Sequence, residues 1–459
     1  MNEHITAGND RIDTVGNDRI DEETGSPRLN RRGFLKIGAL AGVAGVAAAN
    51  CSGLDGSGRD AGGGESAATG VSSDPEAVAA DLQQNVYTRM LGVRPHIGAH
   101  SHLSSMGGSR MPAEVMEAMT EANRFFVDME DLHAAAGRRL AEIAGAEDAL
   151  VSSGAFAALL VGAAGVLTGT DEERMAVLPR PTWPKVECLF QTPHRFFYDK
   201  VFQYAGMTLV EADTRQAYEE AISDRTALLV GLSFIEHQNT GRPPFPAKYR
   251  QPTPPETLMP EEIIEIGRRK GVPVMIDMAS DVRPIRNLKR YIEMGADLVI
   301  VSGGKALRGP NSSGILAGRG DLIEAARMQN APNNGIGRGL KVGKEEIIGL
   351  IAAVERFVEI DEETMIAGWN RKARWLADQL QDIPGLEASY EINTAGYADV
   401  ELIWDQEVFP LSREDVDKAL KDGTPSVIYY GEGICTKQFE DGEEVLVANR
   451  LRELFTQGS

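Results

Sequence analysis

The chain is poor in positive charge. Its 459 residues include 47 lysines and arginines against 68 aspartates and glutamates, a formal net charge of −21. A protein that binds nucleic acid needs basic surface to displace the counterions of the phosphates. The charge balance therefore argues against a nucleic-acid partner, and we interpret the acidic excess mainly as a feature that keeps the protein soluble.

Cysteine and long apolar runs are also scarce. The three cysteines are Cys51, Cys188 and Cys435. One disulfide between the last two is compatible with an oxidising compartment, but such distant cysteines are more often buried and free. The apolar run at residues 37–49 is rich in Gly and Ala and falls short of the roughly 20 residues that a membrane-spanning helix needs.

That short run follows Asn30-Arg-Arg-Gly-Phe-Leu-Lys36, and the two together predict a twin-arginine export signal. We expect residues 1–50 to be a disordered leader and signal peptide, read by the twin-arginine export machinery, with a periplasmic or extracellular product. Ala47-Ala-Ala49 fits a cleavage site. Cys51 leaves a lipid anchor as the alternative, but Asn50 is a poor neighbour for a lipid-modified cysteine, which favours a soluble product.

A lysine in a glycine loop carries the strongest chemical signal. The apolar run from Asp297 ends in Ser302-Gly-Gly-Lys305, followed by Gly309-Pro310. Small residues let the backbone approach a ring and a phosphate closely, and the lysine can form a Schiff base with the aldehyde of pyridoxal phosphate (PLP). The alternative for this motif alone is a solvated surface lysine.

A second apolar run, Val272–Asp277, ends in a carboxylate. An Asp there can pair with the pyridinium nitrogen of PLP and keep the ring an electron sink, or it can be only a helix cap or turn former. Residues 285–294 between the two runs are typical of a short amphipathic helix. Strand, helix and strand place Asp277 and Lys305 at one edge of a parallel sheet, where α/β proteins bind ligands.

A third element lies upstream, where Ala149–Ala155 leads into an apolar helix over Phe156–Leu167. The turn at Ser152, Ser153 and Gly154 offers backbone N–H groups and a helix N-terminus to an anion, here the cofactor phosphate. Taken alone it fits a capped core helix equally well. The order of phosphate turn, ring carboxylate and lysine predicts a PLP enzyme.

At this point the residues resemble a known family. The chain is similar to the pyridoxal enzymes related to bacterial selenocysteine synthase (L-seryl-tRNA selenium transferase), and more closely to the branch that includes D-glucosaminate-6-phosphate ammonia-lyase. The resembling segments are Met106–Pro112, Phe126–Asp128, Gly145–Ala149, Val151–Ala155, Ile276–Ala279, Ser302–Lys305, Gly309-Pro310, Gly337–Glu346, Trp404-Asp405 and Gly423–Pro425.

The resemblance implies residue roles and an assembly. By it Lys305 is the Schiff-base lysine, Asp277 the pyridine partner, Ser152, Ser153 and Gly154 phosphate ligands, and Ser302 a further ligand. It also implies a homodimer or higher homo-oligomer with active sites at subunit contacts.

The chain departs from the family's pattern where a substrate is expected. The family carries an Asn-Ala-x-Gly-Thr-like stretch there, whereas this chain has three histidines in His96-Ile-Gly-Ala-His-Ser-His102. His100 and His102, two residues apart, share one face of an extended segment. They suit proton transfer or substrate binding, and the alternative is a polar loop that caps backbone groups. We expect no metal site, because no third ligand stands at a fixed spacing.

Three further residues are candidates. His194, in a segment that the family also begins with a His-Arg-like pair, has a flat ring that can stack on the pyridine face; a packed core residue is equally compatible. Arg338 and Lys341 can bind the phosphate or a substrate carboxylate. The alternative for the stretch from Arg338 to Lys344 is a solvated charge run.

The remaining pattern predicts an α/β protein of two domains. Residues 51–78, rich in Gly, Ser, Ala and Asp, are expected to form a flexible linker. Residues 79–343 are expected to form an N-terminal arm and a large PLP-binding domain with a mostly parallel sheet, of the aspartate aminotransferase type (fold type I). Residues 344–459 are expected to form a smaller C-terminal α/β domain.

The sequence therefore predicts an exported PLP-dependent lyase or transferase that acts on a small amino acid or amino-sugar acid. Lys305 would remove the Cα proton and a β-substituent would leave. Racemase, aldolase and aminotransferase chemistry need the same first residues and stay as alternatives. An alternative of another class is an inactive exported binding protein with the same fold.

Overall fold

The computed structural model describes residues 74–238, 254–392, 396–429 and 433–457. The predicted leader, export signal and Cys51 lie outside the described residues. Helix α1 (Pro75–Gln83) begins inside the predicted 51–78 linker, because the Asp74 side chain accepts from the Glu76 N–H and caps the helix. Helix α1 thus overlaps the last four residues of the predicted linker, and residues 51–73 lie outside the described residues.

A seven-stranded sheet forms the centre of the described chain, in the order β2-β8-β7-β6-β5-β3-β4. Strand β8 runs antiparallel to its neighbours, and the pairs from β7 through β6, β5 and β3 to β4 are parallel. The strands are β2 (Asp148–Ser152), β3 (Glu187–Gln191), β4 (Thr208–Ala212), β5 (Thr226–Leu232), β6 (Val274–Asp277), β7 (Leu298–Ser302) and β8 (Gly314–Gly318). The predicted mostly parallel α/β sheet is confirmed.

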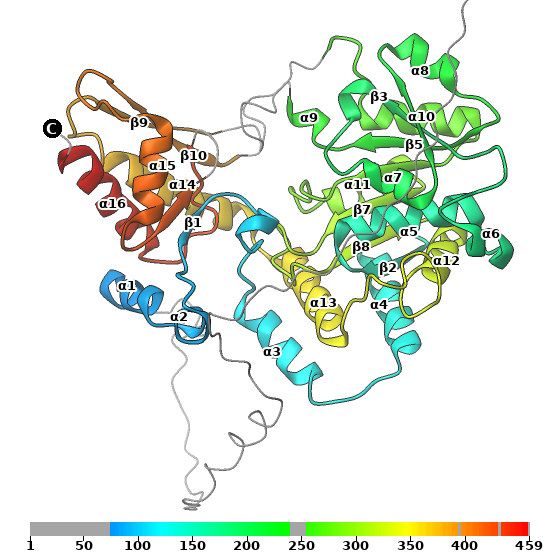
Figure 1. Cartoon of the computed structure of the whole chain (residues 1–459), viewed down its shortest axis with the longest axis horizontal. Helices are drawn as coiled ribbons and strands as arrows, with labels where there is room; N and C mark the ends of the chain where they lie inside the picture. Colours follow the sequence, from blue (N-terminus) through cyan, green and yellow to red (C-terminus); the bar gives the residue numbers. More distant parts are fainter. Residues whose placement is uncertain (1–73, 239–253, 393–395, 430–432, 458–459) are drawn as a thin grey trace, which may run out of the picture. The chain divides into compact units, whose positions relative to one another are not determined.

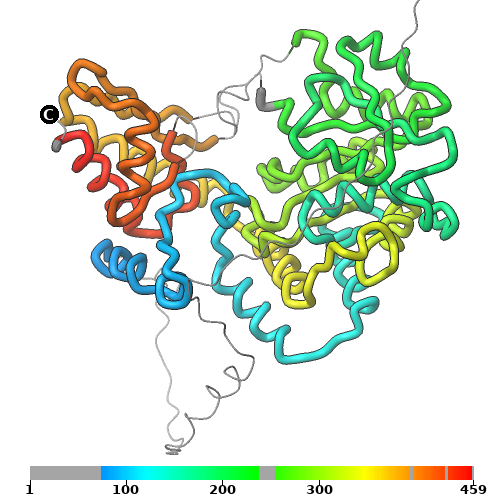
Figure 2. Tube along the Cα trace, viewed as in Figure 1, coloured from blue at the N-terminus to red at the C-terminus, as the bar shows by residue number. Residues whose placement is uncertain are grey.

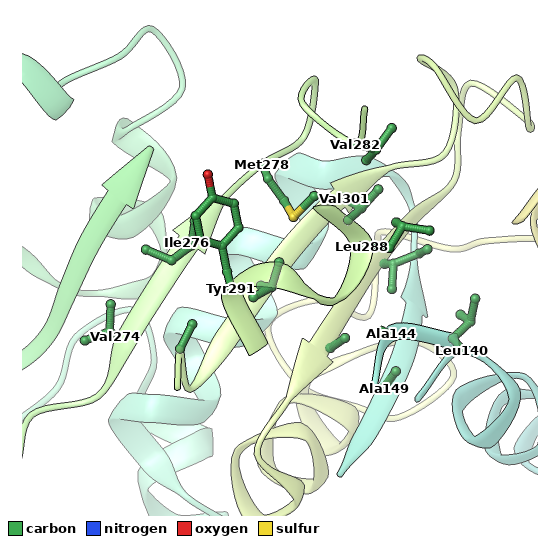
Figure 3. Close-up of a cluster of buried hydrophobic side chains, with 14 of the residues drawn as sticks. Leu140, Ala144, Ala149, Val274, Ile276, Met278, Val282, Leu288, Tyr291 and Val301 are labelled. Atoms are coloured by element: carbon green, nitrogen blue, oxygen red, sulfur yellow. The ribbon is translucent and has the colours of Figure 1, made fainter. Parts of the chain in front are cut away.

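Both faces of this sheet are buried (Figure 1). In β7, Val299 and Val301 belong to one core and Leu298 and Ile300 to the other, as the two-residue period of a strand requires. The first core, partly drawn in Figure 3, is completed by α4 (Met129–Ala144), α10 (Pro260–Lys270), α11 (Asn287–Met294) and α13 (Lys344–Glu359). The second is completed by α5 (Gly154–Thr168), α7 (Lys200–Ala205) and α12 (Gly320–Gln329).

Shorter helices connect these elements. They are α3 (Ala113–Ala122), α6 (Glu172–Val177), α8 (Arg215–Ala221), α9 (Ile235–Gln238) and the 3-10 turns η1 (Ser104–Met106) and η2 (Thr192–His194). Each predicted element of the large region is present within a few residues of its expected limits, including the helix predicted over 285–294.

Cys188 and Cys435 are free and buried, as expected. Among the described helices, none is long and apolar enough to cross a membrane.

A separate core unites the two ends of the described chain. The antiparallel strands β9 (Leu386–Ile392), β10 (Ala398–Trp404) and β12 (Gly433–Ile434) form a three-stranded sheet. The N-terminal β1 (Ile97–Ala99) pairs in parallel with β11 (Val427–Tyr429), which the blue and red ends of the tube in Figure 2 make visible. The helices of this part are α1, α2 (Val86–Leu91), α14 (Glu362–Asp378), α15 (Arg413–Asp422) and α16 (Glu443–Gln457).

This core includes residues of the predicted N-terminal arm. Val78 and Ile97 are buried together with Leu420 and Phe455. The arm is therefore built into the core of the C-terminal part, and the two-domain limits drawn from the sequence remain a prediction.

Helices α5 and α12 pack with a glycine at their contact. A Cβ on Gly165 would lie 2.7 Å from the backbone N of Ala326, whereas a Cβ on Gly162 of the same helix would meet first the flexible end of Met275 at 2.8 Å. We expect Gly165→Ala to lower the free energy of unfolding by about 1–3 kcal/mol through overpacking against rigid backbone, although Ala favours helix.

Gly162→Ala is the matched control, because a methionine end can move aside. Urea unfolding of both variants measures the difference. An equal loss of stability in the two, or none in Gly165→Ala, would contradict the close helix contact.

Candidate active site

The lysine loop begins where β7 ends at Ser302. The Gly303 N–H donates to the Ser313 carbonyl at 2.8 Å, and the Gly309 N–H donates to the Gly303 carbonyl at 2.9 Å. A Cβ on Gly303 would lie 2.0 Å from Ser313 Oγ, so only glycine fits there. These bonds fix the turn from which Lys305 projects.

Lys305 and Asp277 lie at the same edge of the sheet, as predicted, because β6 and β7 are parallel neighbours with Asp277 opposite Ile300. Asp277 Oδ1 accepts from the Ala279 N–H at 2.9 Å, and Lys305 Nζ lies 3.4 Å from Ser280 Oγ. Burial raises the pKa of Asp277, an effect that the Ala279 N–H and the Lys305 charge oppose. Burial lowers the pKa of Lys305, and the Asp277 charge opposes that shift.

The amine and the carboxylate feel each other's charge, yet among the described residues they form no salt bridge with each other. A partly buried acid and a partly buried base that do not pair with each other suit a polar group that pairs with both. A pyridinium ring with an aldehyde is such a group.

The predicted phosphate turn meets the lysine loop through β8. Ser152 and Ser302 both pair with Gly314, so the ends of β2 and β7 flank one residue of the strand between them. A Cβ on Gly314 would lie 2.5 Å from the carbonyl carbon of Gly154, which explains why this position is a glycine. The turn and Lys305 are therefore parts of one site.

The turn itself opens helix α5. Ser152 is buried and its Oγ donates to the Gly154 carbonyl at 2.9 Å, whereas Ser153 caps the helix without a side-chain bond to its backbone. Gly154 has φ 83°, and a Cβ there would meet nothing within 4 Å. The start of α5 thus presents backbone N–H groups to open space, which fits a phosphate. The donor set of this turn, Asp277 and Lys305 fits PLP.

His194 has no exposed surface. The Leu232 N–H donates to its Nδ1 at 3.0 Å, so Nε2 carries the proton and donates to the Leu258 carbonyl at 2.8 Å. Burial lowers its pKa to about 4. The sequence left two alternatives open for His194, and this arrangement is that of a packed core residue. The ring hydrogen-bonds to backbone behind the sheet edge. It neither exchanges protons nor offers an open face on which a cofactor could stack.

The histidine loop divides into two environments. His100 is buried, and its Nδ1 lies 2.7 Å from the Ser101 carbonyl, so Nδ1–H donates and Nε2 accepts from His96 Nε2 at 3.1 Å. Burial is the largest cause that lowers the pKa of both rings. The His100 ring therefore forms a hydrogen bond with the ring of His96, the residue before β1, and not with His102.

His102 lies among cations that the sequence did not single out. Burial is the largest cause that lowers the pKa of His102, the charges of Lys437, Arg308, Lys305 and Arg283 follow in that order, and together they bring it to about 3. The predicted candidate His102 is thus placed near Lys305, in a positive environment. It stays neutral at ordinary pH and offers one N–H donor and one acceptor.

Arg110, Arg283, Arg308 and Lys437 were missed. Arg308 stands three residues after Lys305, and Arg110 lies in the first resembling segment, so both had a positional signal. Arg283 and Lys437 stand in segments without a motif. Among the described residues, no group of three or more His, Cys, Asp or Glu side chains is arranged for a metal ion.

Arg338 and Lys341 are exposed in the loop that leads to α13. In the part of the chain that the structure describes, no hydrogen bond or ion pair joins either side chain to Lys305, Asp277 or the α5 turn. The role of these two candidates therefore stays a prediction.

Known proteins share this arrangement. The family described as "SelA: L-seryl-tRNA selenium transferase" matches residues 103–367. A 5'-C-glycyluridine monooxygenase-decarboxylase from a Streptomyces species is 34% identical over 384 residues, covering 79% of this chain and 90% of that protein. D-Glucosaminate-6-phosphate ammonia lyase of Salmonella typhimurium is 27% identical over 395 residues, covering 81% of this chain and 98% of that protein.

A solved structure agrees with these sequence matches. The structure of a D-glucosaminate-6-phosphate ammonia-lyase has a TM-score of 0.69 and 25% identity, over 82% of this chain and 99% of that chain.

The buried carboxylate predicts a pH-dependent stability. Because the folded-state pKa of Asp277 lies above the ordinary 3.8, the group favours the fold below pH 3.8, and that contribution is lost as the pH rises through the raised pKa. We expect Asp277→Asn to make the PLP-free protein more stable than the parent at pH 7, a difference that shrinks toward acid pH, and to abolish PLP retention.

Asp321→Asn is the control of opposite sign. Its hydrogen bond with Arg319 lowers the pKa of Asp321, so its contribution is present above pH 3.8 and lost as the pH falls through the lowered value. Urea unfolding at several pH values compares the two. A less stable Asp277→Asn protein at pH 7 would show that the carboxylate is not held in a desolvated site.

Proposed function

This chain belongs to the L-seryl-tRNA selenium transferase (SelA) family, and from that premise we propose that it is an exported lyase that eliminates a β-substituent from a small amino acid or amino-sugar acid. The coarser identity is plain: the protein is a fold-type I, PLP-dependent enzyme of the lyase kind. The proposal concerns its reaction, its substrate and its place of action.

The predicted residues are the ones that would hold the cofactor. Lys305 would be the covalent attachment point, Asp277 would pair with the ring nitrogen, and the Ser152–Gly154 turn would take the phosphate. Ser302 is buried at the end of β7, where it pairs with Gly314 of β8. When bound, PLP supplies a carbon that accepts the substrate amine and a ring that withdraws electrons from Cα.

The single observation that carries the proposal is the state of Lys305. Burial lowers the pKa of its amine, which shifts it toward the neutral form that can accept the Cα proton. Lys305 Nζ takes the proton from Cα, the bond between Cβ and its substituent then breaks, and the substituent leaves with the bonding electrons. Asp277, as a carboxylate, holds the proton on the ring nitrogen.

A neutral His102 beside Lys305 supports a polar substrate. It can donate a hydrogen bond to one substrate oxygen and accept one from a hydroxyl without adding charge. His96 and His100 hold the preceding backbone. A transferase, in which a nucleophile adds in place of the lost substituent, uses the same residues and stands as the alternative, as do racemase, aldolase and aminotransferase reactions.

A second candidate reaction is favoured by one relative. The 34% identical Streptomyces protein is a monooxygenase-decarboxylase, and this favours, as the second candidate, breakage of the bond between Cα and a carboxylate with O₂ as co-substrate. Oxygen uptake separates this reaction from elimination, which releases ammonia without consuming O₂.

We also propose that the enzyme does not act on tRNA. The charge of −21 opposes binding to a polyphosphate, and the predicted export removes the protein from aminoacylated tRNA. Assembly into a homo-oligomer is supported by the apolar surface of α2, where Tyr87 is 58%, Met90 75% and Leu91 73% exposed.

Lys305→Ala tests the enzyme proposal. We expect the purified parent, loaded with PLP, to show the visible absorption of the bound cofactor and to shift it with one member of a panel of D- and L-amino acids and amino-sugar acids. The variant should lose the band and the reaction entirely, because it lacks both the attachment point and the base.

Ammonia, keto acid and O₂ are measured together in the same panel. Ammonia with keto acid and no O₂ uptake is expected; O₂ uptake with CO₂ would replace elimination by the second candidate. A parent with no band after PLP addition would leave the exported binding protein of the same fold.

The export proposal has its own test. We expect the double change Arg31→Lys and Arg32→Lys to retain an uncleaved precursor in the cytoplasm, because the twin arginines are the recognised element. Arg28→Lys, just outside the motif, is the control and should be exported and processed. Cell fractionation with immunoblotting gives the distribution, and efficient export of the double variant would refute the assignment.

A further inference from the structure

Two glycines precede Lys305, and each needs an outside contact to fix its backbone, because glycine has the widest conformational freedom. Gly303 is fixed by the two backbone hydrogen bonds described above. The carbonyl of the buried Gly304 accepts instead from a side chain of the N-terminal arm, Ser109 Oγ, at 3.0 Å. Among the described residues, this carbonyl has no second hydrogen bond.

The Gly304 carbonyl is part of the peptide unit that leads into Lys305. Its oxygen lies in one plane with the nitrogen and the Cα of Lys305, because the peptide bond does not rotate freely. A hydrogen bond to that oxygen therefore limits the orientation of the whole unit. It also limits the direction in which the lysine side chain leaves the backbone.

The residue before Ser109 lies directly against the lysine loop. Gly108 is buried and has φ 78°, and its carbonyl accepts from the Gln438 side-chain amide at 3.2 Å. A Cβ on Gly108 would lie 2.6 Å from Asn311 Oδ1 and 3.2 Å from the Gly304 carbonyl oxygen. Only glycine permits this close approach, which brings the next side chain, that of Ser109, to the loop.

The residue after Ser109 is anchored on two sides. The Arg110 carbonyl accepts from Arg308 Nε at 2.8 Å, and the Arg110 guanidinium makes hydrogen bonds of 2.8 and 2.7 Å to the buried Glu443 carboxylate. Such charge-assisted bonds are stronger than neutral ones. Arg308 has φ 57°, a conformation that is unfavourable for an L-residue and that its contacts must offset. Ser109 is thus placed by two fixed neighbours.

We propose that Ser109 is a positioning residue for Lys305. Its hydroxyl fixes the peptide unit between Gly304 and Lys305, and through that unit the amine. The inference rests on the proposed function, in which Lys305 binds the cofactor and takes the proton from Cα. Both events depend on where Nζ lies: attachment joins Nζ to the aldehyde carbon of PLP with loss of water, and proton transfer needs Nζ close to Cα.

Ser109→Ala tests the proposal. The change adds no bulk but leaves the buried Gly304 carbonyl without its partner, so the loop should lose its fixed orientation. We expect PLP binding, measured by equilibrium dialysis, to weaken about tenfold. We expect kcat to fall about tenfold or more with KM changed less than about twofold, because substrate binding does not depend on the amine. Ser109→Thr keeps the hydroxyl and should stay within about twofold of the parent in both measurements.

A second dialysis series asks whether Ser109 acts through the lysine. In a Lys305→Ala background, adding Ser109→Ala should leave the remaining PLP affinity unchanged, because the hydroxyl then has no amine to position. Ser312→Ala is the matched control, since this serine lies in the same loop but donates to Glu346 at 2.5 Å, away from the lysine peptide. It should match the parent, and urea unfolding accompanies every variant.

Three results would overturn the role of Ser109. They are an unchanged PLP affinity and kcat in Ser109→Ala, an equal loss in Ser109→Ala and Ser109→Thr, and an equal weakening by Ser109→Ala with and without Lys305. The dialysis measures attachment and not elimination. A parent that retains PLP through Lys305 but releases no ammonia would therefore refute the lyase reaction, and the two dialysis series would still decide the role of Ser109.

Discussion

Two partly buried ionisable groups that do not pair with each other are the constraint on which this structure depends. Asp277 ends β6, and Lys305 follows the parallel neighbour β7 at the same edge of the sheet. Burial raises the pKa of the acid and lowers that of the amine, which is unfavourable for the empty protein. The glycines around these two residues and the helices on both faces of the sheet provide packing that offsets this unfavourable burial.

Much of this arrangement followed from the sequence because its signals are local. Lys305, Asp277 and the Ser152–Gly154 turn each stand at the end of an apolar run, and the edge of a parallel sheet brings such ends together. The helices predicted over 156–167 and 285–294 were visible in the same way. What was predicted poorly depends on long-range contact: the burial of His194 is decided by Leu232 and Leu258, which no pattern near residue 194 contains.

The cation cluster also depends on long-range contacts that no local sequence pattern reveals. Arg110, Arg283, Arg308 and Lys437 come from segments more than a hundred residues apart in most pairs, without a shared spacing, so only the fold assembles them. Arg338 and Lys341 are the reverse case. Their charge run is a candidate ligand site in the sequence, but both side chains are exposed in a loop, where the described structure adds no contact to the pattern.

The pairing of β1 with β11 sets the order in which the chain can fold. Ile97 lies opposite Val427, and the core that contains them also needs Phe455, near the last residues. Contacts between such distant segments form slowly, because a long loop must close first. During synthesis the α1–β1 segment emerges before β11 and stays without its partner until β11 has left the ribosome. This core therefore cannot be completed before Phe455 has been synthesised.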